Sequence, residues 1–185
     1  MTLEEIRTNI DEIDNDIKRL FAERMKLSEE VVLLKAETGN EIYKPEREKQ
    51  IIEKLSKDTE SGIYDEYRSF VKHILLLSRK YQYRRMTELK DPYKAVPENS
   101  GEVDIEKHNR IKISLGSKDK KCNPSKALQI ISEYGIEMSE INYTEETGVL
   151  IVELNANILD KKTVTLLYQL SKENEEFRII GSYTA

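Results

Sequence analysis

Residues 3–38 contain a periodic apolar series that limits what this chain can fold into. Isoleucine, leucine and valine recur there at alternating gaps of four and three residues, which is the a/d spacing of a coiled coil. The series consists of Ile6, Ile10, Ile13, Ile17, Leu20, Leu27, Val31 and Leu34, and we call it the apolar stripe. No glycine or proline interrupts it before Gly39. The pattern predicts one long amphipathic helix that packs through this stripe.

The predicted helix is too long to bury the apolar stripe within its own half of the chain. At about 1.5 Å per residue it would extend roughly 50 Å, whereas a small domain is about 30 Å across. We therefore expect a second copy of the chain to cover the stripe, giving a homodimer. The stripe has one gap, at Arg24. A buried cation is costly unless an anion meets it, so Arg24 either sets the register, extends its head to water or binds an anion.

Composition and charge exclude several classes of function. Of the 185 residues 35% are charged and 38% are hydrophobic, which suits long, solvated helices more than a thick core. The net charge of −5 argues against a general nucleic-acid binder. The single cysteine, Cys122, excludes an internal disulfide framework and fits a reducing cytoplasm. The acidic N-terminal segment lacks the apolar region of a signal peptide, and no apolar run is long enough to cross a membrane. We therefore expect a cytoplasmic protein.

Two further helices are predicted after this first one, and they bring more polar residues to packing faces. Pro45 suits the first position of the second helix, and the third helix is expected over about residues 65–89. The candidate site residues on the three helices are Arg7, Arg24, Lys35, Arg47, Glu48, Ser78 and Gln82. Four cations against one carboxylate would make an uncompensated positive pocket. We therefore expect a small, doubly negative ligand that carries a hydroxyl.

Each candidate also has an explanation that needs no ligand. Arg47 and Glu48 could form an ion pair at a helix end, and Ser78 and Gln82 could bond to backbone or water. The two histidines are isolated, and the N-terminal half has no Cys–His pair, glycine-rich phosphate loop or metal-ligand cluster. We accordingly expect neither a metal nor another cofactor.

Taken in order, the motifs of residues 3–86 resemble those of the all-helical (type II) chorismate mutases. They are Ile6-Arg7 with Ile13-Asp14, Ala22-Glu23-Arg24, Val31 with Lys35, Ile-Tyr-Lys-Pro-Glu-Arg-Glu at residues 42–48, and Ser-Arg-Lys-Tyr-Gln at residues 78–82. The resemblance implies an intertwined dimer in which three helices per chain build two sites, each completed by the partner's first helix. It also implies the cofactor-free Claisen rearrangement of chorismate to prephenate, in phenylalanine and tyrosine biosynthesis.

The resemblance also implies which residues would accelerate this rearrangement. Arg24 and the partner subunit's Arg7 would bind the two substrate carboxylates, using the bidentate geometry of arginine. Lys35 and Gln82 would donate to the breaking ether oxygen, whose negative charge grows only on the way to the transition state.

The remaining site residues would bind the rest of the substrate. By the same resemblance Glu48 would accept from the ring hydroxyl, while Arg47 and Ser78 would support the carboxylate and ring contacts. Lys44 stands where family members often carry aspartate, and is a substrate-binding candidate as well. A backbone contact at this position would survive the difference, whereas a side-chain contact to the substrate hydroxyl would not.

The second half of the chain has a different pattern. Residues 89–108 are rich in proline and polar residues and are predicted to form a linker between a domain at 1–88 and one at 109–185. The expected elements are strand 110–115, helix 124–134, strands 136–143 and 149–154, helix 160–174 and strand 177–183. This βαββαβ order is the split ferredoxin-like plan. The predicted fold class is thus α + α/β, with two domains.

The second domain resembles an ACT domain, especially that of prephenate dehydratases, in the Ile-Gly-Ser-Tyr of residues 180–183. Lys126 stands where amino-acid-binding versions have a glycine, and Glu-Ile-Asn-Tyr at residues 140–143 replaces a Glu-Ser-Arg-Pro run. Binding of an aromatic amino-acid effector and added dimer contact therefore stand as equal alternatives.

Two other functions of the whole chain stay open beside the mutase. It could be a non-catalytic, metabolite-sensing partner of another aromatic-pathway enzyme, although the complete cationic set favours catalysis. It could also be an isochorismate pyruvate-lyase with the same helical plan, although Lys35 and Gln82 suit the mutase.

Overall fold

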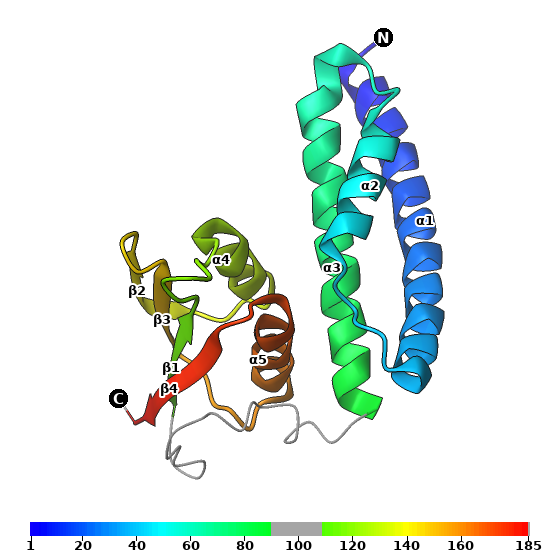
Figure 1. Cartoon of the computed structure of the whole chain (residues 1–185). Coiled ribbons are helices and arrows are strands. Elements are labelled where there is room, and N and C mark those ends of the chain that lie inside the picture. The colour runs from blue at the N-terminus through cyan, green and yellow to red at the C-terminus, as the bar shows by residue number, and fades with distance from the viewer. Residues whose placement is uncertain (90–108, 185) are drawn as a thin grey trace.

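The structure, a computed structural model, describes residues 1–89 and 109–184. Its elements follow in the order α1 (Leu3–Thr38), α2 (Pro45–Ser56), the 3₁₀ helix η1 (Ser61–Ile63), α3 (Tyr64–Leu89), β1 (Arg110–Leu115), α4 (Pro124–Glu133), β2 (Met138–Thr144), β3 (Val149–Leu154), α5 (Lys161–Glu173) and β4 (Phe177–Tyr183). The helices α1, α2 and α3 lie side by side, and the sheet with α4 and α5 forms the other half (Figure 1). Apart from Leu89, the predicted linker lies outside the described residues.

Both ends of α1 are set by local sequence. The Thr2 hydroxyl accepts from the Glu5 N–H at 3.2 Å, and the Glu5 carboxylate accepts from the Thr2 N–H at 2.7 Å, which forms a capping box. At the other end Gly39 has a φ of 70°, a left-handed conformation that favours glycine and ends the helix. The predicted range of 3–38 is confirmed.

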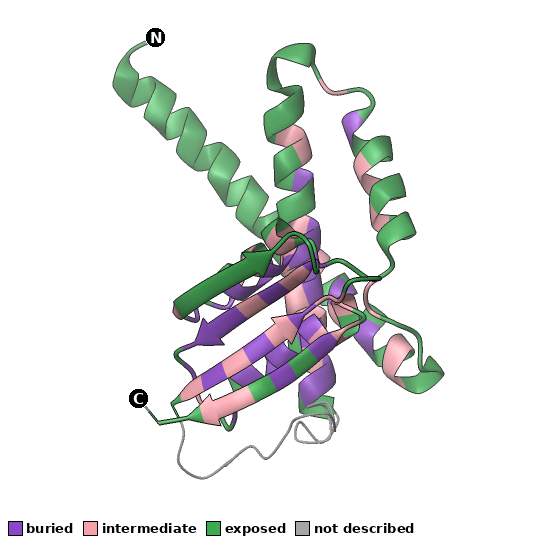
Figure 2. Cartoon of the chain, turned by 60° about the vertical axis from the view of Figure 1, so that its left-hand side comes forward, coloured by how far each residue is buried: buried purple, intermediate pink, exposed green. Residues whose placement is uncertain are grey.

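Within the chain, α1 packs through a face other than the apolar stripe. Ser28 and Val32 are buried, and Phe21 and Met25 are half-buried, with the same spacing but one position further along. All residues of the apolar stripe are exposed, by 40% to 62%, and α1 is exposed over most of its length (Figure 2). The described chain therefore leaves an apolar surface along its longest helix.

Helix α3 is shared by the two halves of the chain. One of its faces, with Val71 and Leu75, belongs to the helical half, and a second buried face consists of Leu76, Arg79, Tyr83 and Met86. Leu76 joins the hydrophobic core of the C-terminal half. The Tyr83 ring meets that of Tyr168 on α5 edge to face, with centroids 5.8 Å apart, and the hydroxyls of Thr87 and Thr165 are 3.1 Å apart. These contacts hold α5 against α3.

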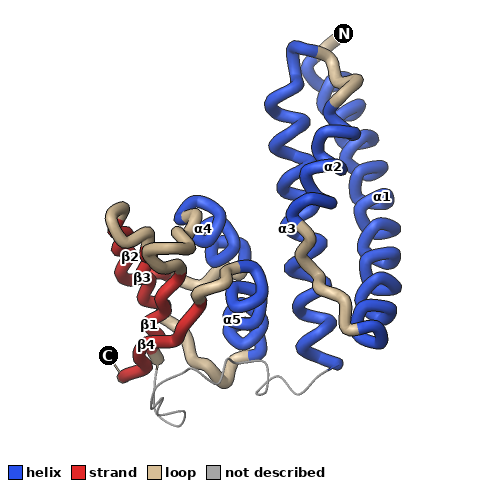
Figure 3. The backbone as a smooth tube through the Cα atoms, in the orientation of Figure 1, coloured by secondary structure: helices blue, strands red, loops and turns tan. Residues whose placement is uncertain are grey.

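The C-terminal half is a four-stranded antiparallel sheet with the strand order β2-β3-β1-β4, so the predicted ferredoxin-like plan is confirmed. Ile111, Ile113 and Leu115 alternate with more exposed residues along β1 and form the core with β3, α4 and α5. The two helices lie between the sheet and α3 (Figure 3). Strand β2 begins at Met138, two residues after the predicted start at 136. Ile136 is buried, but pairing with β3 starts only at Met138.

Among the described residues, no helix combines the length and apolarity that a membrane crossing needs.

Candidate active site

Arg24 and Ser78 meet between α1 and α3. The Arg24 guanidinium donates through Nη1 to the Ser78 hydroxyl, and both side chains are at least partly buried. Burial lowers the pKa of Arg24 from its ordinary value, while the negative charge of Glu48 acts in the opposite direction. Arg24 forms no ion pair within the described part of the chain. Among the described residues, the packing therefore holds a cation that no carboxylate contacts directly.

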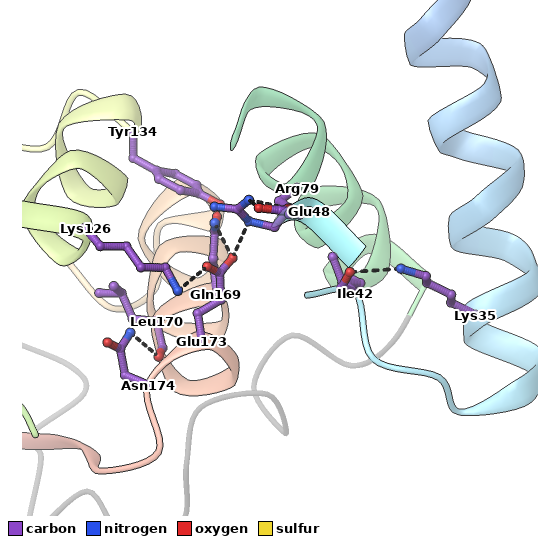
Figure 4. Close-up of polar contacts among 10 residues, drawn as sticks. All are labelled: Lys35, Ile42, Glu48, Arg79, Lys126, Tyr134, Gln169, Leu170, Glu173 and Asn174. Atoms are coloured by element: carbon purple, nitrogen blue, oxygen red, sulfur yellow. Dashed lines mark hydrogen bonds and ion pairs between the residues drawn. The ribbon is translucent and has the colours of Figure 1, made fainter. Parts of the chain in front are cut away.

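Lys35 lies at the end of α1 and is held by the loop that leads to α2. Its Nζ donates to the carbonyl oxygen of Ile42 at 2.9 Å (Figure 4). Burial, and then the positive charge of Lys44, lower the pKa of Lys35, and Glu48 raises it in part. An ammonium has three N–H donors, so this one carbonyl leaves two for a ligand.

Gln82 follows Ser78 by one helical turn on the same face of α3. Its Oε1 is buried and has no hydrogen-bond partner among the described residues. Buried polar atoms of this kind are rare in folded proteins because each one loses its water without compensation. Rotation of the side-chain amide by 180° exchanges the positions of Oε1 and Nε2, so Gln82 can present an N–H donor at the same point. Gln82 is thus ready to bind a polar ligand atom.

Glu48, on the first turn of α2, accepts from Nη1 of Arg79 with both carboxylate oxygens. Arg79 was not among the predicted site residues, although it belongs to the motif of residues 78–82. A signal for it was present: Arg79 interrupts the apolar spacing of Leu76, Tyr83 and Met86, just as Arg24 interrupts the apolar stripe. Since Glu48 is already paired, Arg24 and Lys35 have even less compensation than composition suggested.

Three of the candidates lie on the surface of the single chain: Arg7, Lys44 and Arg47. Neighbouring positions of a helix point about 100° apart, and in the single chain Arg47 is exposed whereas Glu48 is half-buried. Lys44 is the N-cap residue of α2, and its carbonyl accepts the first hydrogen bond of that helix from the Glu48 N–H at 3.1 Å. Of the other candidates, Arg24 contacts Ser78, and Glu48 lies close enough to Arg24 and Lys35 for its charge to act on both. Gln82 lies one helical turn beyond Ser78 on α3.

Two cavities lie near these helices. A small one of about 150 Å³ reaches Lys35 and is also lined by Tyr168 and Lys172 of α5. A larger one, of about 870 Å³, lies between the two halves of the chain and is lined by none of the candidate residues. Size alone therefore does not identify the site. The candidate site is the group of Arg24, Lys35, Glu48 and Ser78, which interact with one another, together with Gln82 on the next turn of α3.

The described residues contain no group of three or more histidines, cysteines or carboxylates that could hold a metal ion. Nδ1 of His73 lies 3.6 Å from Oε1 of Glu133, and His108 falls outside the described residues. The chemistry that the site offers is the binding and polarisation of an anion by guanidinium, ammonium, hydroxyl and amide groups.

Comparison with known proteins concerns the helical half of the chain. The family model described as Chorismate mutase type II matches residues 6–83. The chain is 38% identical over 85 residues to the chorismate mutase of Methanocaldococcus jannaschii. That match covers 43% of this chain and 86% of the Methanocaldococcus protein. It is 36% identical over 87 residues to the bifunctional chorismate mutase/prephenate dehydratase of Aquifex aeolicus, which covers 42% of this chain. The match spans only 24% of the Aquifex protein. No solved structure matches the chain. By its match to nearly the full length of the Methanocaldococcus enzyme, this chain belongs to the type II chorismate mutase family.

Proposed function

We propose that this chain is a chorismate mutase that converts chorismate to prephenate at the site formed by Arg24, Lys35, Glu48, Ser78 and Gln82. The observation that carries the proposal is the pairing pattern of the site. Arg24 and Lys35 are partly buried and form no ion pair among the described residues, and the buried Oε1 of Gln82 has no partner. A dianion that also bears an ether oxygen and a hydroxyl would satisfy these groups together.

The rearrangement is intramolecular, so this site would act by holding and by polarising the substrate. Arg24 would bind a carboxylate and favour the reactive, folded conformer. Lys35 and Gln82 would donate to the ether oxygen as it gains negative charge, which stabilises the transition state more than the ground state. Glu48, held by Arg79, would accept from the ring hydroxyl.

The functional unit that we propose is a homodimer. The apolar stripe is exposed along α1, and its burial against a second α1 would remove a large apolar surface from water. Arg7 lies beside the stripe and is exposed in the single chain. Contact across a dimer would let the partner subunit's Arg7 bind the second substrate carboxylate.

We assign residues 1–88 to the mutase domain, 89–108 to a linker and 109–185 to an ACT-like domain. The role that we propose for this second domain is structural support of the mutase half rather than phenylalanine sensing. Lys126, which replaces the expected glycine, has its Nζ 3.9 Å from the ring centroid of Tyr43 in the mutase half. The cytoplasmic location stays a prediction, supported by the free and buried Cys122.

The test is formation of prephenate by the purified full-length chain, measured with and without each aromatic amino acid. We expect turnover without any added metal or cofactor. A parallel assay for pyruvate release from isochorismate addresses the lyase alternative. A folded protein that transforms neither substrate would contradict an enzymatic function and favour the non-catalytic partner.

A further inference from the structure

A polar cluster joins the mutase site to the C-terminal half of the chain. Arg79 lies at its centre on α3: its Nη1 donates to Glu48 of α2, and its Nε donates to Oε1 of Glu173 on α5 at 2.9 Å (Figure 4). Glu48 and Glu173 are 125 positions apart, which follows from their numbers in the sequence. A single guanidinium thus connects the two carboxylates, each from a different half of the chain.

The cluster is buried, so its geometry is constrained. The exposed fractions of the side chains are 8% for Arg79, 21% for Glu48 and 0% for Glu173. Burial opposes the charge of Arg79, but the two carboxylates outweigh this effect, so that the pKa of Arg79 is raised. The guanidinium therefore stays charged and cannot turn to water without losing its bonds to both carboxylates.

Further contacts fix the position of Glu173. Gln169 donates from Nε2 to Oε1 of Glu173 at 2.9 Å and accepts from the Tyr134 hydroxyl at 2.7 Å. Lys126 Nζ lies 3.2 Å from Oε2, at ion-pair distance but without hydrogen-bond geometry. These partners come from α4 and α5, so the packing of the C-terminal half determines where the Glu173 carboxylate lies.

We infer that Glu173 is a positioning residue of the mutase site, which acts through Arg79 on the carboxylate of Glu48. This inference rests on the proposed function, in which Glu48 accepts from the ring hydroxyl of the substrate. Because Glu173 takes the Nε–H of Arg79, the guanidinium is oriented with Nη1 towards Glu48. Without the charge of Glu173, Arg79 would be balanced by Glu48 alone and would draw it away from the substrate. The C-terminal half is thereby a component of the mutase site.

The test compares Glu173→Gln in the full-length protein with the matched control Glu175→Gln. Glu175 is an exposed neighbour that pairs with Lys120 and touches nothing in the cluster. Each variant is assayed with chorismate and with a chorismate analogue that lacks the ring hydroxyl. For Glu173→Gln we expect kcat/KM with chorismate to fall about tenfold or more, the effect of weakening one hydrogen bond to a charged group. With the analogue, and with the control variant, kcat/KM stays within about twofold of wild type.

The outcomes separate positioning from mere structural support. Equal losses with both substrates would overturn the inference, because a general structural defect does not distinguish them. Unchanged kinetics in a folded variant would overturn it as well. If Glu173→Gln does not fold, Glu173→Asp keeps the charge on a shorter side chain, and it must show a smaller loss that is again confined to chorismate. A wild-type chain that makes no prephenate would instead contradict the proposed function.

Discussion

The Nζ of Lys35 lies 2.9 Å from the carbonyl oxygen of Ile42, to which it donates. This bond connects the last turn of α1 to the loop before α2 and restricts a side chain that is otherwise flexible. The loop begins at Gly39, so the end of α1 and the position of the ammonium depend on each other. A donor held in place before the reaction loses little free energy to reorganisation, which is what stabilisation of a developing charge requires.

The role proposed for Lys35 predicts an activity that is sensitive to alkaline pH. Burial and Lys44 lower its pKa below the ordinary value of 10.5, and only the protonated amine brings a positive charge to the ether oxygen. Activity is therefore present at neutral pH and lost as the pH rises through this lowered pKa. The measurement is kcat/KM against pH, which reports groups of the free enzyme. In Lys35→Arg, which stays charged, the residual activity should not show this alkaline loss; an unchanged profile would assign it to another group.

Replacement of Arg24 by alanine should abolish most of the mutase activity. The substitution removes the contact to one substrate carboxylate, and we expect kcat/KM to fall by a factor on the order of 100 or more. Arg19→Ala is the matched control, because Arg19 is an exposed arginine of the same helix that pairs with Asp16 and Glu23. Circular dichroism and light scattering should report a folded dimer for both. Substantial turnover by Arg24→Ala would remove this residue from the site.

Mixing of two inactive variants tests whether the sites are shared between chains. Arg7→Ala and Arg24→Ala are unfolded together and refolded, so that the chains reassort. Half of the dimers would then be hybrids, each with one intact site of two, which predicts recovery of about a quarter of wild-type activity. If refolded wild-type protein is active but the mixture is not, then Arg7 does not act across the interface.

A charge within the apolar stripe should dissociate the dimer. Ile13 is 59% exposed in the single chain, so Ile13→Glu removes little from the core of the chain but places a carboxylate in the proposed interface. We expect a monomer by size-exclusion chromatography with light scattering, and with it loss of prephenate formation. Lys18→Gln, one position beyond the stripe residue Ile17, is the control and should remain dimeric. A dimeric Ile13→Glu protein would place the interface elsewhere.

Titration with phenylalanine should give no heat in a calorimeter and no change in mutase rate. The physical reason is that Lys126 occupies the place of the glycine that amino-acid-binding ACT domains have, and its amine is engaged with Tyr43 and Glu173. Tyrosine, and glycine as a non-aromatic control, should likewise give no heat and no change in mutase rate. Saturable heat with phenylalanine alone would instead assign the C-terminal half to regulation.

Most of the secondary structure could be predicted from the amino-acid sequence, because hydrophobic periodicity and end signals are local. The spacing of the apolar stripe and Gly39 placed α1, and alternation along residues 110–115 placed β1. Unusual positions for charge were visible as well, as for Arg24. Such signals name the residues of a site but not their partners.

Which side chains contact one another became visible in the folded chain alone. It buries Val32 rather than Val31 of the stripe, and it turns Glu48 inward and Arg47 outward. It also pairs Arg79 with both Glu48 and Glu173. The physical reason is that a buried charge is neutralised by whichever element packs against it, and that element can lie anywhere in the chain. The packing of α5 on α3 brings Glu173 to Arg79, and no local pattern around either residue encodes this contact.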